Sequence, residues 1–218
     1  MFARSAAPLF EFDFKLCGGA GELAGADEAG RGSFAGPLVT AAVVFDYSRL
    51  GSGPARELLD GLYDSKKMTA PARERIYPLL MRSAARFAVV VSGARSIDRN
   101  GVHRTNLHDL ERCLAMISPC PELVLVDGWK LPAGAPPHRP VKGGDSLSAA
   151  IAAASVIAKV TRDRLMHRLH LLYPQYGFDS HVGYGTRAHR EAIAAHGYSP
   201  LHRRSFKSDS IFRTAGAG

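Results

Sequence analysis

Carboxylates occur in this sequence where predicted strands end and where a predicted helix begins. Asp27, Glu28 and Asp127 each follow a short apolar run that is typical of a buried strand. Asp145 follows a glycine pair and precedes an alanine-rich segment. Ligands of open α/β sheets collect at the carboxyl ends of the strands. We therefore expect these four side chains to lie close together.

Such a cluster has a definite chemistry. Neighbouring carboxylates repel one another, and burying them unpaired is costly, so a cation usually neutralises them. Sites built only from oxygen ligands select Mg²⁺ or Mn²⁺. In phosphodiester hydrolysis one such ion activates water and a second stabilises the leaving oxygen. The chain has 28 Lys+Arg against 20 Asp+Glu, a net charge of +8, which favours nucleic acid as partner over an anionic membrane. Together these features predict a metal-dependent nuclease.

Each acid also has a purely structural interpretation. Asp127 precedes a glycine and could close a turn. Asp145 precedes a serine and could cap the following helix. Adjacent residues of a regular strand point to opposite faces, so Asp27 and Glu28 can share a metal only if the chain bends there. Spacing alone leaves these alternatives open.

Strands and helices are predicted to alternate along the chain, with the proline-rich stretch 132–140 as a loop inside one domain. Short β-rich runs predict strands at 23–26, 39–45, 87–91 and 123–126, and helical spacing or composition predicts helices at 71–86, 105–117, from 146 to about 172, and near 187–195. This pattern predicts an α/β fold.

Length and composition limit the classes of protein. A chain of 218 residues with 46% hydrophobic and 22% charged residues is expected to form one globular domain. Its three cysteines form no C-x-x-C pair, which argues against a disulfide framework or zinc cluster and favours a cytoplasmic location. No apolar stretch reaches the ~18–20 residues that span a bilayer, so neither membrane insertion nor export is expected. A monomer is expected, since no apolar stripe suggests a self-complementary face.

The chain resembles the type 2 ribonucleases H, in particular bacterial ribonuclease HII, in several motifs that follow the order of that family. These are GADEAGRG at 25–32, DSKK at 64–67, LVDG at 125–128, GDS at 144–146, AASVIAKVTRD at 153–163, QYGF at 175–178, GYGT at 183–186 and HRRSF at 202–206. The likeness runs from about 23 to 206, and so many ordered motifs together are highly specific.

The resemblance implies a ribonuclease H-like fold, which is a mixed central sheet flanked by helices, with a C-terminal helical extension. It places a type 2 ribonuclease H domain at 23–213, of which about 187–213 is the helical and basic extension. An N-terminal extension at 1–22 precedes the domain, and a frayed tail at 214–218 follows it.

The resemblance also implies the activity. The family hydrolyses the RNA strand of RNA–DNA hybrids and nicks 5′ of a ribonucleotide embedded in duplex DNA, leaving 3′-hydroxyl and 5′-phosphate ends, a role in ribonucleotide removal from DNA. Its partners are therefore such hybrids and duplexes, and its cofactor is Mn²⁺ or Mg²⁺, with two ions per site during catalysis. The implied catalytic acids are Asp27, Glu28, Asp127 and Asp145, of which the first three hold metal. Asp163, in a more conspicuous motif, is expected to pair instead with a neighbouring arginine on its helix.

Substrate reading is assigned by the resemblance to Gly30, Arg31, Gly32 and Tyr184. Glycines let the backbone approach a sugar closely, and a contact at the 2′-hydroxyl distinguishes RNA from DNA. Without the family, Arg31 would be interpreted as a solvated loop cation and Tyr184 as a half-buried core aromatic.

Further contacts are expected from the second motif and from one helix. Ser65, Lys66 and Lys67 are expected to hold backbone phosphates, with a solvated charge pair as the alternative. Asn106 resembles a family position that faces the DNA strand, with a helix-capping or solvent-exposed role as the alternative.

Some features separate this chain from relatives and rivals. Gly143 and Gly144 stand where many relatives have one glycine, which could shift Asp145 slightly. The paralogous ribonuclease HIII has a threonine at the position of Arg31 and an added N-terminal domain, so the chain resembles type HII. A non-catalytic binder of structured nucleic acid would bind in a salt-dependent way without metal-dependent turnover. A phosphodiesterase of small nucleotides is disfavoured because the +8 charge suits a long polyanion.

Overall fold

The computed structural model describes residues 5–50 and 54–206, and in these the strands form one mixed sheet. Its order is β3 (Arg86–Ser92), β2 (Leu38–Asp46), β1 (Glu22–Ala29), β4 (Leu123–Asp127) and β5 (Arg139–Val141). β1 pairs antiparallel with β2, and β2 with β3, whereas β4 pairs parallel with β1 and with β5. The parallel pair in the middle brings the carboxyl ends of β1 and β4 to the same edge.

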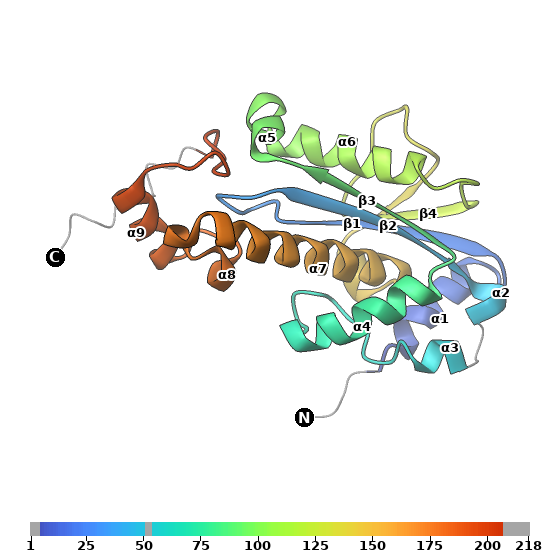
Figure 1. Cartoon of the computed structure of the whole chain (residues 1–218). Coiled ribbons are helices and arrows are strands. Elements are labelled where there is room, and N and C mark those ends of the chain that lie inside the picture. Colours follow the sequence, from blue (N-terminus) through green and yellow to red (C-terminus); the bar gives the residue numbers. More distant parts are fainter. Residues whose placement is uncertain (1–4, 51–53, 207–218) are drawn as a thin grey trace.

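Helices cover both faces of the sheet (Figure 1). They are α1 (Ala7–Leu16), α2 (Tyr47–Leu50), α3 (Pro54–Glu57), α4 (Ala70–Ser83), α5 (Ala94–Asn100), α6 (Val102–Ala115), α7 (Ala149–Leu172), α8 (Phe178–His181) and α9 (Arg187–His196), with short 3-10 turns η1 (Gly144–Ser146) and η2 (Pro174–Tyr176). α7 packs on β1 and β2 on one face, with α1 and α4 outside it, and α6 packs on β2 and β3 on the other. Every residue of β2 but the last is buried, as expected for a strand covered on both faces.

α7 approaches β1 so closely that only glycine fits between them. A Cβ at Gly25 would lie 2.2 Å from the backbone of Ala150 and Ile151. The first two turns of α7 are fully buried and rich in alanine, which keeps the helix thin on this side. The hydroxyl of Ser148 caps the helix by accepting a hydrogen bond from the Ile151 amide at 3.3 Å. The small residues of β1 and α7 thus set the distance between helix and sheet.

α1, which the sequence pattern did not predict, packs its apolar side into the core. Leu9 and Phe10 are buried there. On the same helix, buried Asp13 accepts hydrogen bonds from the Tyr47 hydroxyl at 2.6 Å and from the Ala150 amide, at the start of α7, at 2.9 Å. The segment before β1 therefore supports the helix that carries the alanine-rich motif.

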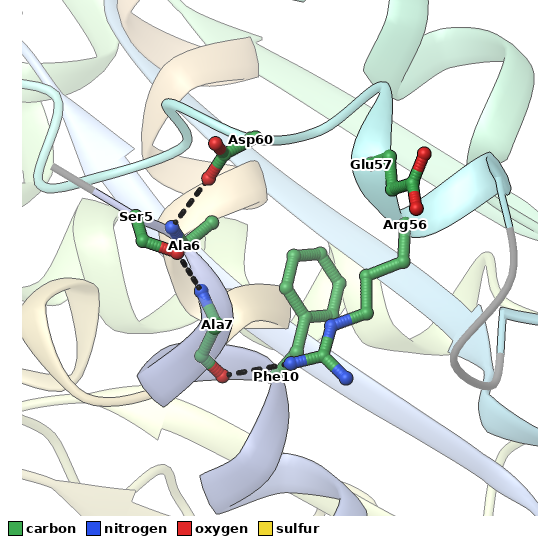
Figure 2. Close-up of a pocket in the computed structure, with 7 residues that line it drawn as sticks. All are labelled: Ser5, Ala6, Ala7, Phe10, Arg56, Glu57 and Asp60. Carbon is green, nitrogen blue, oxygen red and sulfur yellow. Dashed lines mark hydrogen bonds between the residues drawn. The ribbon is translucent and has the colours of Figure 1, made fainter. Parts of the chain in front are cut away.

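Figure 2 shows how the start of α1 is attached to α3 and to the segment that follows α3. The Asp60 carboxylate accepts a hydrogen bond from the Ala6 amide at 3.0 Å, and the Arg56 guanidinium donates to the Ala7 carbonyl at 3.3 Å. The side chains of Phe10 and Glu57 also line this pocket. Its contacts join α1 to α3 and the segment after it, rather than to the carboxylates of the predicted site.

The predicted α/β class and ribonuclease H-like architecture are confirmed, and each predicted strand and helix has a counterpart. Several elements lie where none was predicted, among them α5 and β5. α5 is separated from α6 by Gly101, whose φ of 78° ends the first helix. β5 begins inside the proline-rich stretch, where an edge strand tolerates Pro140. The predicted domain limits stay predictions, and the tail at 214–218 lies outside the described residues.

Candidate active site

The first two acids lie on β1 just beyond the point where its pairing with β4 ends. The parallel pairing of β1 with β4 ends at Ala26 and Val126, so Asp27 comes beside Asp127. The β1–β2 pairing continues to Ala29 without a break in register. Even so, Glu28 and Asp27 both lie close enough to Asp127 for its charge to raise their pKa. The expected clustering at the strand ends is thus present, although β1 keeps its pairing.

Asp27 is the most deeply buried of the four acids, with 2% of its surface exposed. Its Oδ1 accepts a hydrogen bond from the Glu28 amide at 2.7 Å, and its Oδ2 has no hydrogen-bond partner within the described residues. Burial raises the pKa of Asp27 well above its usual value, and the charges of Glu28 and Asp127 add to the effect, whereas the Ser155 hydroxyl opposes it. An ionised Asp27 therefore requires a compensating cation.

Glu28 has neighbours that favour its charged form. Burial raises its pKa, but the Asn106 amide and the Arg31 guanidinium oppose that rise. Arg31 Nη1 lies 3.9 Å from Glu28 Oε1, while Oε2 lacks a hydrogen-bond partner in the described part of the chain. Asn106 is fully buried on α6, so the solvent-exposed alternative for this residue is wrong.

Asp127 and Asp145 are joined through the turn η1. Asp127 Oδ1 accepts a hydrogen bond from the Gly144 amide at 2.7 Å, and a Cβ at Gly144 would lie 2.4 Å from Ile151 Cδ1. Burial raises the pKa of Asp127, and the Asp145 charge raises it further. Because Ser148 caps α7, the capping alternative for Asp145 is wrong. The Asp127 carboxylate bonds across 17 residues rather than closing the turn at the end of β4.

The second motif lies beside this cluster and divides into inward and outward side chains. The Ser65 hydroxyl is buried and 2.8 Å from the Ser155 hydroxyl, so it faces the neighbour of Asp27. Lys66 Nζ lies 3.3 Å from Asp145 Oδ2, and Lys67 Nζ lies 3.0 Å from Asp64 Oδ2. Both lysine side chains are more than half exposed. The lysines, rather than the serine hydroxyl, are available to a ligand.

Asp163 has a role outside the cluster, as expected, although its partners differ from the expected one. It binds Lys159 Nζ at 2.8 Å on its own helix and Arg73 Nη2 at 3.6 Å on α4. Arg73 Nη1 donates to the carbonyls of Ser65 at 2.8 Å and Met68 at 2.6 Å. Asp163 therefore fixes the loop that carries the two lysines.

Two buried arginines that the sequence analysis passed over support the glycine loop. Gly30 has φ 89°, and a Cβ there would lie 1.9 Å from Arg162 Nε. Arg162 donates to the Ser33 hydroxyl and to three backbone carbonyls, and Arg203 donates to the Arg31 carbonyl at 3.0 Å. Burial lowers the pKa of both, that of Arg203 to about 9. The sequence feature that could have identified both arginines is their position in the motifs at 153–163 and 202–206.

Tyr184 lies next to this loop. The Phe34 amide donates to the Gly183 carbonyl at 2.8 Å, which brings the two segments side by side. The Tyr184 ring is 37% exposed, with Lys159 Nζ 5.5 Å and Arg162 Cζ 5.4 Å from its centroid. The structure thus brings together the glycine loop and Tyr184, with the ring accessible at the surface rather than in the core.

The acids fit a divalent cation by their chemistry. In residues 5–50 and 54–206, no group of three or more His, Cys, Asp or Glu side chains is already arranged to hold a metal. However, Asp27 Oδ2 and Glu28 Oε2 are buried without hydrogen-bond partners in the described part of the chain. Burial raises the pKa of Asp27, Glu28 and Asp127, and the charges of neighbouring acids add to that rise. Unpartnered carboxylate oxygens of this kind are the ligands that Mg²⁺ and Mn²⁺ prefer.

Comparison with known proteins agrees with this geometry. The family model described as Ribonuclease HII matches residues 24–209. The chain belongs to the ribonuclease HII family. It is 48% identical to the ribonuclease HII of Mycobacterium ulcerans over 189 residues, which cover 86% of this chain and 76% of that relative. Family membership makes it a ribonuclease H, a hydrolase that acts on RNA–DNA hybrids.

Solved structures extend the likeness to the fold. Ribonuclease H2 from Pyrococcus horikoshii OT3 has a TM-score of 0.72 and 25% identity, with 88% of this chain and 99% of that chain covered. Ribonuclease HII of Archaeoglobus fulgidus, solved in complex with PCNA, has a TM-score of 0.66 and 28% identity, with 85% and 95% covered.

Two further findings concern the surroundings of the protein. Residues 5–50 and 54–206 contain no helix that is both long and apolar enough to cross a membrane. Cys17, Cys113 and Cys120 are all free thiols.

Proposed function

We propose that this chain is a divalent-metal-dependent endonuclease that nicks duplex DNA on the 5′ side of an embedded ribonucleotide and cuts the RNA strand of hybrids. The products would carry 3′-hydroxyl and 5′-phosphate ends. The observation that carries the proposal is the buried acidic cluster with unpartnered oxygens on Asp27 and Glu28, directly beside the glycine loop. A general hydrolase would need the acids, but only a nuclease that reads the sugar needs the loop and Tyr184 as well.

Asp27, Glu28 and Asp127 would hold the metal, and Asp145 would complete the site. A bound Mg²⁺ or Mn²⁺ supplies Lewis acidity to the phosphate and lowers the pKa of water. The buried carboxylates themselves must be ionised to bind a cation, and a cation would offset the burial and the mutual repulsion that raise their pKa. Asn106, fully buried on α6, would keep a polar amide near the Glu28 carboxylate.

The neighbouring residues would bind and orient the nucleic acid. Lys66 and Lys67 would contact backbone phosphates, since their ammonium groups are exposed beside the cluster. The loop of Gly30, Arg31 and Gly32 would bring backbone groups to the 2′-hydroxyl, with the Tyr184 ring against the sugar. Arg162 and Arg203 fix this loop from below through hydrogen bonds to Ser33 and to the Arg31 carbonyl.

The test is cleavage of an end-labelled DNA duplex that contains one ribonucleotide, with Mg²⁺, with Mn²⁺ and with chelator, beside an all-DNA duplex. We expect a metal-dependent nick on the 5′ side of the ribonucleotide and no cut in the control. Asp27→Asn should abolish the nick while duplex binding survives, because it removes one charge from the metal cluster without changing its shape.

Glu11→Gln, which neutralises an exposed acid on α1, is the matched control and should cleave as the wild type does. Normal turnover by Asp27→Asn would refute the assignment of the acids. Tight binding without a nick in either metal would instead support a non-catalytic binder.

A further inference from the structure

Trp129, the single tryptophan of the chain, lies two residues after Asp127 and was given no role by the motifs. Its ring is half-buried and has charged or aromatic neighbours on the site side. The Arg31 guanidinium lies over it, with Cζ 4.3 Å from the ring centroid, and the exposed His103 ring of α6 lies 4.8 Å away at 60°. Trp129 therefore connects β4, α6 and the glycine loop beside the acids.

Arg31 is held at three points. Its carbonyl accepts a hydrogen bond from Arg203 at 3.0 Å, its guanidinium faces Trp129, and Nη1 lies 3.9 Å from Glu28 Oε1. The distance of 3.9 Å is longer than a hydrogen bond, so the contact with Glu28 leaves the N–H donors of Arg31 available to other acceptors. The side chain is 38% exposed, and these donors are accessible to solvent.

The aromatic face gives this arginine a fixed direction. A free arginine side chain at a surface samples many rotamers, and ordering it on binding costs conformational entropy. Contact with an indole face orders the guanidinium plane in advance while leaving its edge, where the N–H donors point, open. A guanidinium presented edge-on suits the paired oxygens of a phosphate.

We propose that Trp129 is a positioning residue that holds the Arg31 guanidinium at the rim of the acidic site, where it binds a backbone phosphate of the nucleic acid. The inference deepens the proposed function and rests on it. Trp129 acts through Arg31, whereas His103 supports the indole from the other element.

Steady-state cleavage of the ribonucleotide-containing duplex tests the inference. Trp129→Ala should raise KM about fivefold and leave kcat within about twofold, because substrate binding loses a preordered phosphate contact while the acids are untouched. Trp129→Phe should have a KM close to that of the wild type, since a phenyl ring also offers a face to the guanidinium. Phe87→Ala, which removes a 41% exposed aromatic from edge strand β3, should change neither constant.

Arg31→Ala tests whether the two side chains act as one. It should raise KM by at least as much as Trp129→Ala, and the double variant should be no worse than Arg31→Ala alone, because Trp129 has no separate contribution. Additive effects of the two changes would overturn the inference.

The single tryptophan also gives a spectroscopic readout. In the Asp27→Asn protein, which binds without cutting, the duplex should change the emission of Trp129, and Arg31→Ala should change the emission of the free protein. Unchanged emission at saturating duplex, with binding verified by anisotropy of a labelled duplex, would contradict the inference. If the wild type cleaves no substrate, the proposed function is refuted. If the wild type cleaves the duplex and Trp129→Ala cleaves it with the same KM and kcat, only the role of Trp129 is refuted.

Discussion

Lys66 shows how a single side chain serves the acidic site from its outer edge. Its ammonium lies 3.3 Å from Asp145 Oδ2, and its side chain is 71% exposed. Partial burial would lower the pKa of Lys66, but the charges of Asp27 and Asp145 outweigh that effect and raise it. The Asp145 side chain is only 7% exposed, so the lysine is the accessible partner of this pair. Its ammonium can therefore meet a backbone phosphate at the edge of the site.

Lys66→Ala should weaken binding of the duplex and reduce the slope of log affinity against log salt by about 1, because one phosphate contact is lost. Anisotropy titrations at several salt concentrations measure both quantities. Lys15→Ala, which removes an exposed lysine from the end of α1, should leave the slope unchanged. An unchanged slope for Lys66→Ala would show that Lys66 makes no phosphate contact.

At the scale of elements, the site depends on how closely α7 packs on β1. The helix supplies Ser155 beside Asp27, Arg162 beneath the glycine loop and Asp163 behind the loop of the lysines. Its position is set by Gly25, where the two backbones meet. A shift of α7 would therefore disturb the acids and the substrate loops together.

Gly25→Ala should destabilise the fold by about 3 kcal/mol or more, because the added methyl meets backbone atoms of α7 that cannot rotate away. Cleavage should fall with it. Chemical denaturation followed by circular dichroism measures the loss of free energy of unfolding. Gly93→Ala, at the N-cap of α5 where a Cβ would meet nothing within 4 Å, should cost no more than about 1 kcal/mol. Equal stabilities of the two variants would contradict this account of the packing.

At the scale of the whole molecule, a chain of neutral histidines joins the C-terminal segment to Tyr184. His202 Nδ1 accepts a hydrogen bond from the Ser199 amide at 2.9 Å, so Nε2 carries the proton and donates to His189 Nε2 at 3.1 Å. His189 Nδ1 then donates to the Tyr184 carbonyl at 2.9 Å. Burial lowers the pKa of both His189 and His202 to about 4. Protonation of either ring nitrogen that accepts would break the chain.

The sign of the pH effect follows from these values. The unfolded chain binds protons near pH 6.5 and the folded histidines only near 4, so their stabilisation is complete above about 6.5 and is lost as pH falls toward 4. We expect amide exchange in 178–203, corrected for intrinsic rates, to accelerate over that interval. His202→Gln should flatten the profile, while His167→Gln, at an exposed site on α7, should not. A pH-independent profile in the wild type would contradict this.

Because Asp13 also titrates in this pH range, the effect of the histidines must be measured by segment rather than for the whole protein. Burial raises the pKa of Asp13 to about 6, so its ionisation destabilises the fold as pH rises from about 4 through 6. The trend is opposite to that of the histidines, and a single melting temperature would mix the two. Asp13 and the histidines belong to different ends of the molecule, so exchange measured by segment separates them.

The sequence by itself determined the alternation of strands and helices and the placing of the four acids at strand ends and a helix entry. These features depend on hydrophobic periodicity and on glycine or proline at turns, which act between near neighbours. The motifs also carried the glycine loop and Tyr184. The dependence on Mg²⁺ or Mn²⁺ and the contact with the 2′-hydroxyl stay predictions from the family resemblance.

Only the tertiary structure decided which side chains meet. Arg203 reaches Gly36 across 167 residues, and Asp13 reaches Ala150 across 137. The proposed role of Trp129 depends on Arg31, which lies in the glycine loop after β1. Short-range sequence patterns do not predict such contacts, because burial and hydrogen bonding between distant segments arise only when the elements pack. The same packing turned Ser65 inward and buried Asn106, although both have the sequence signature of surface residues.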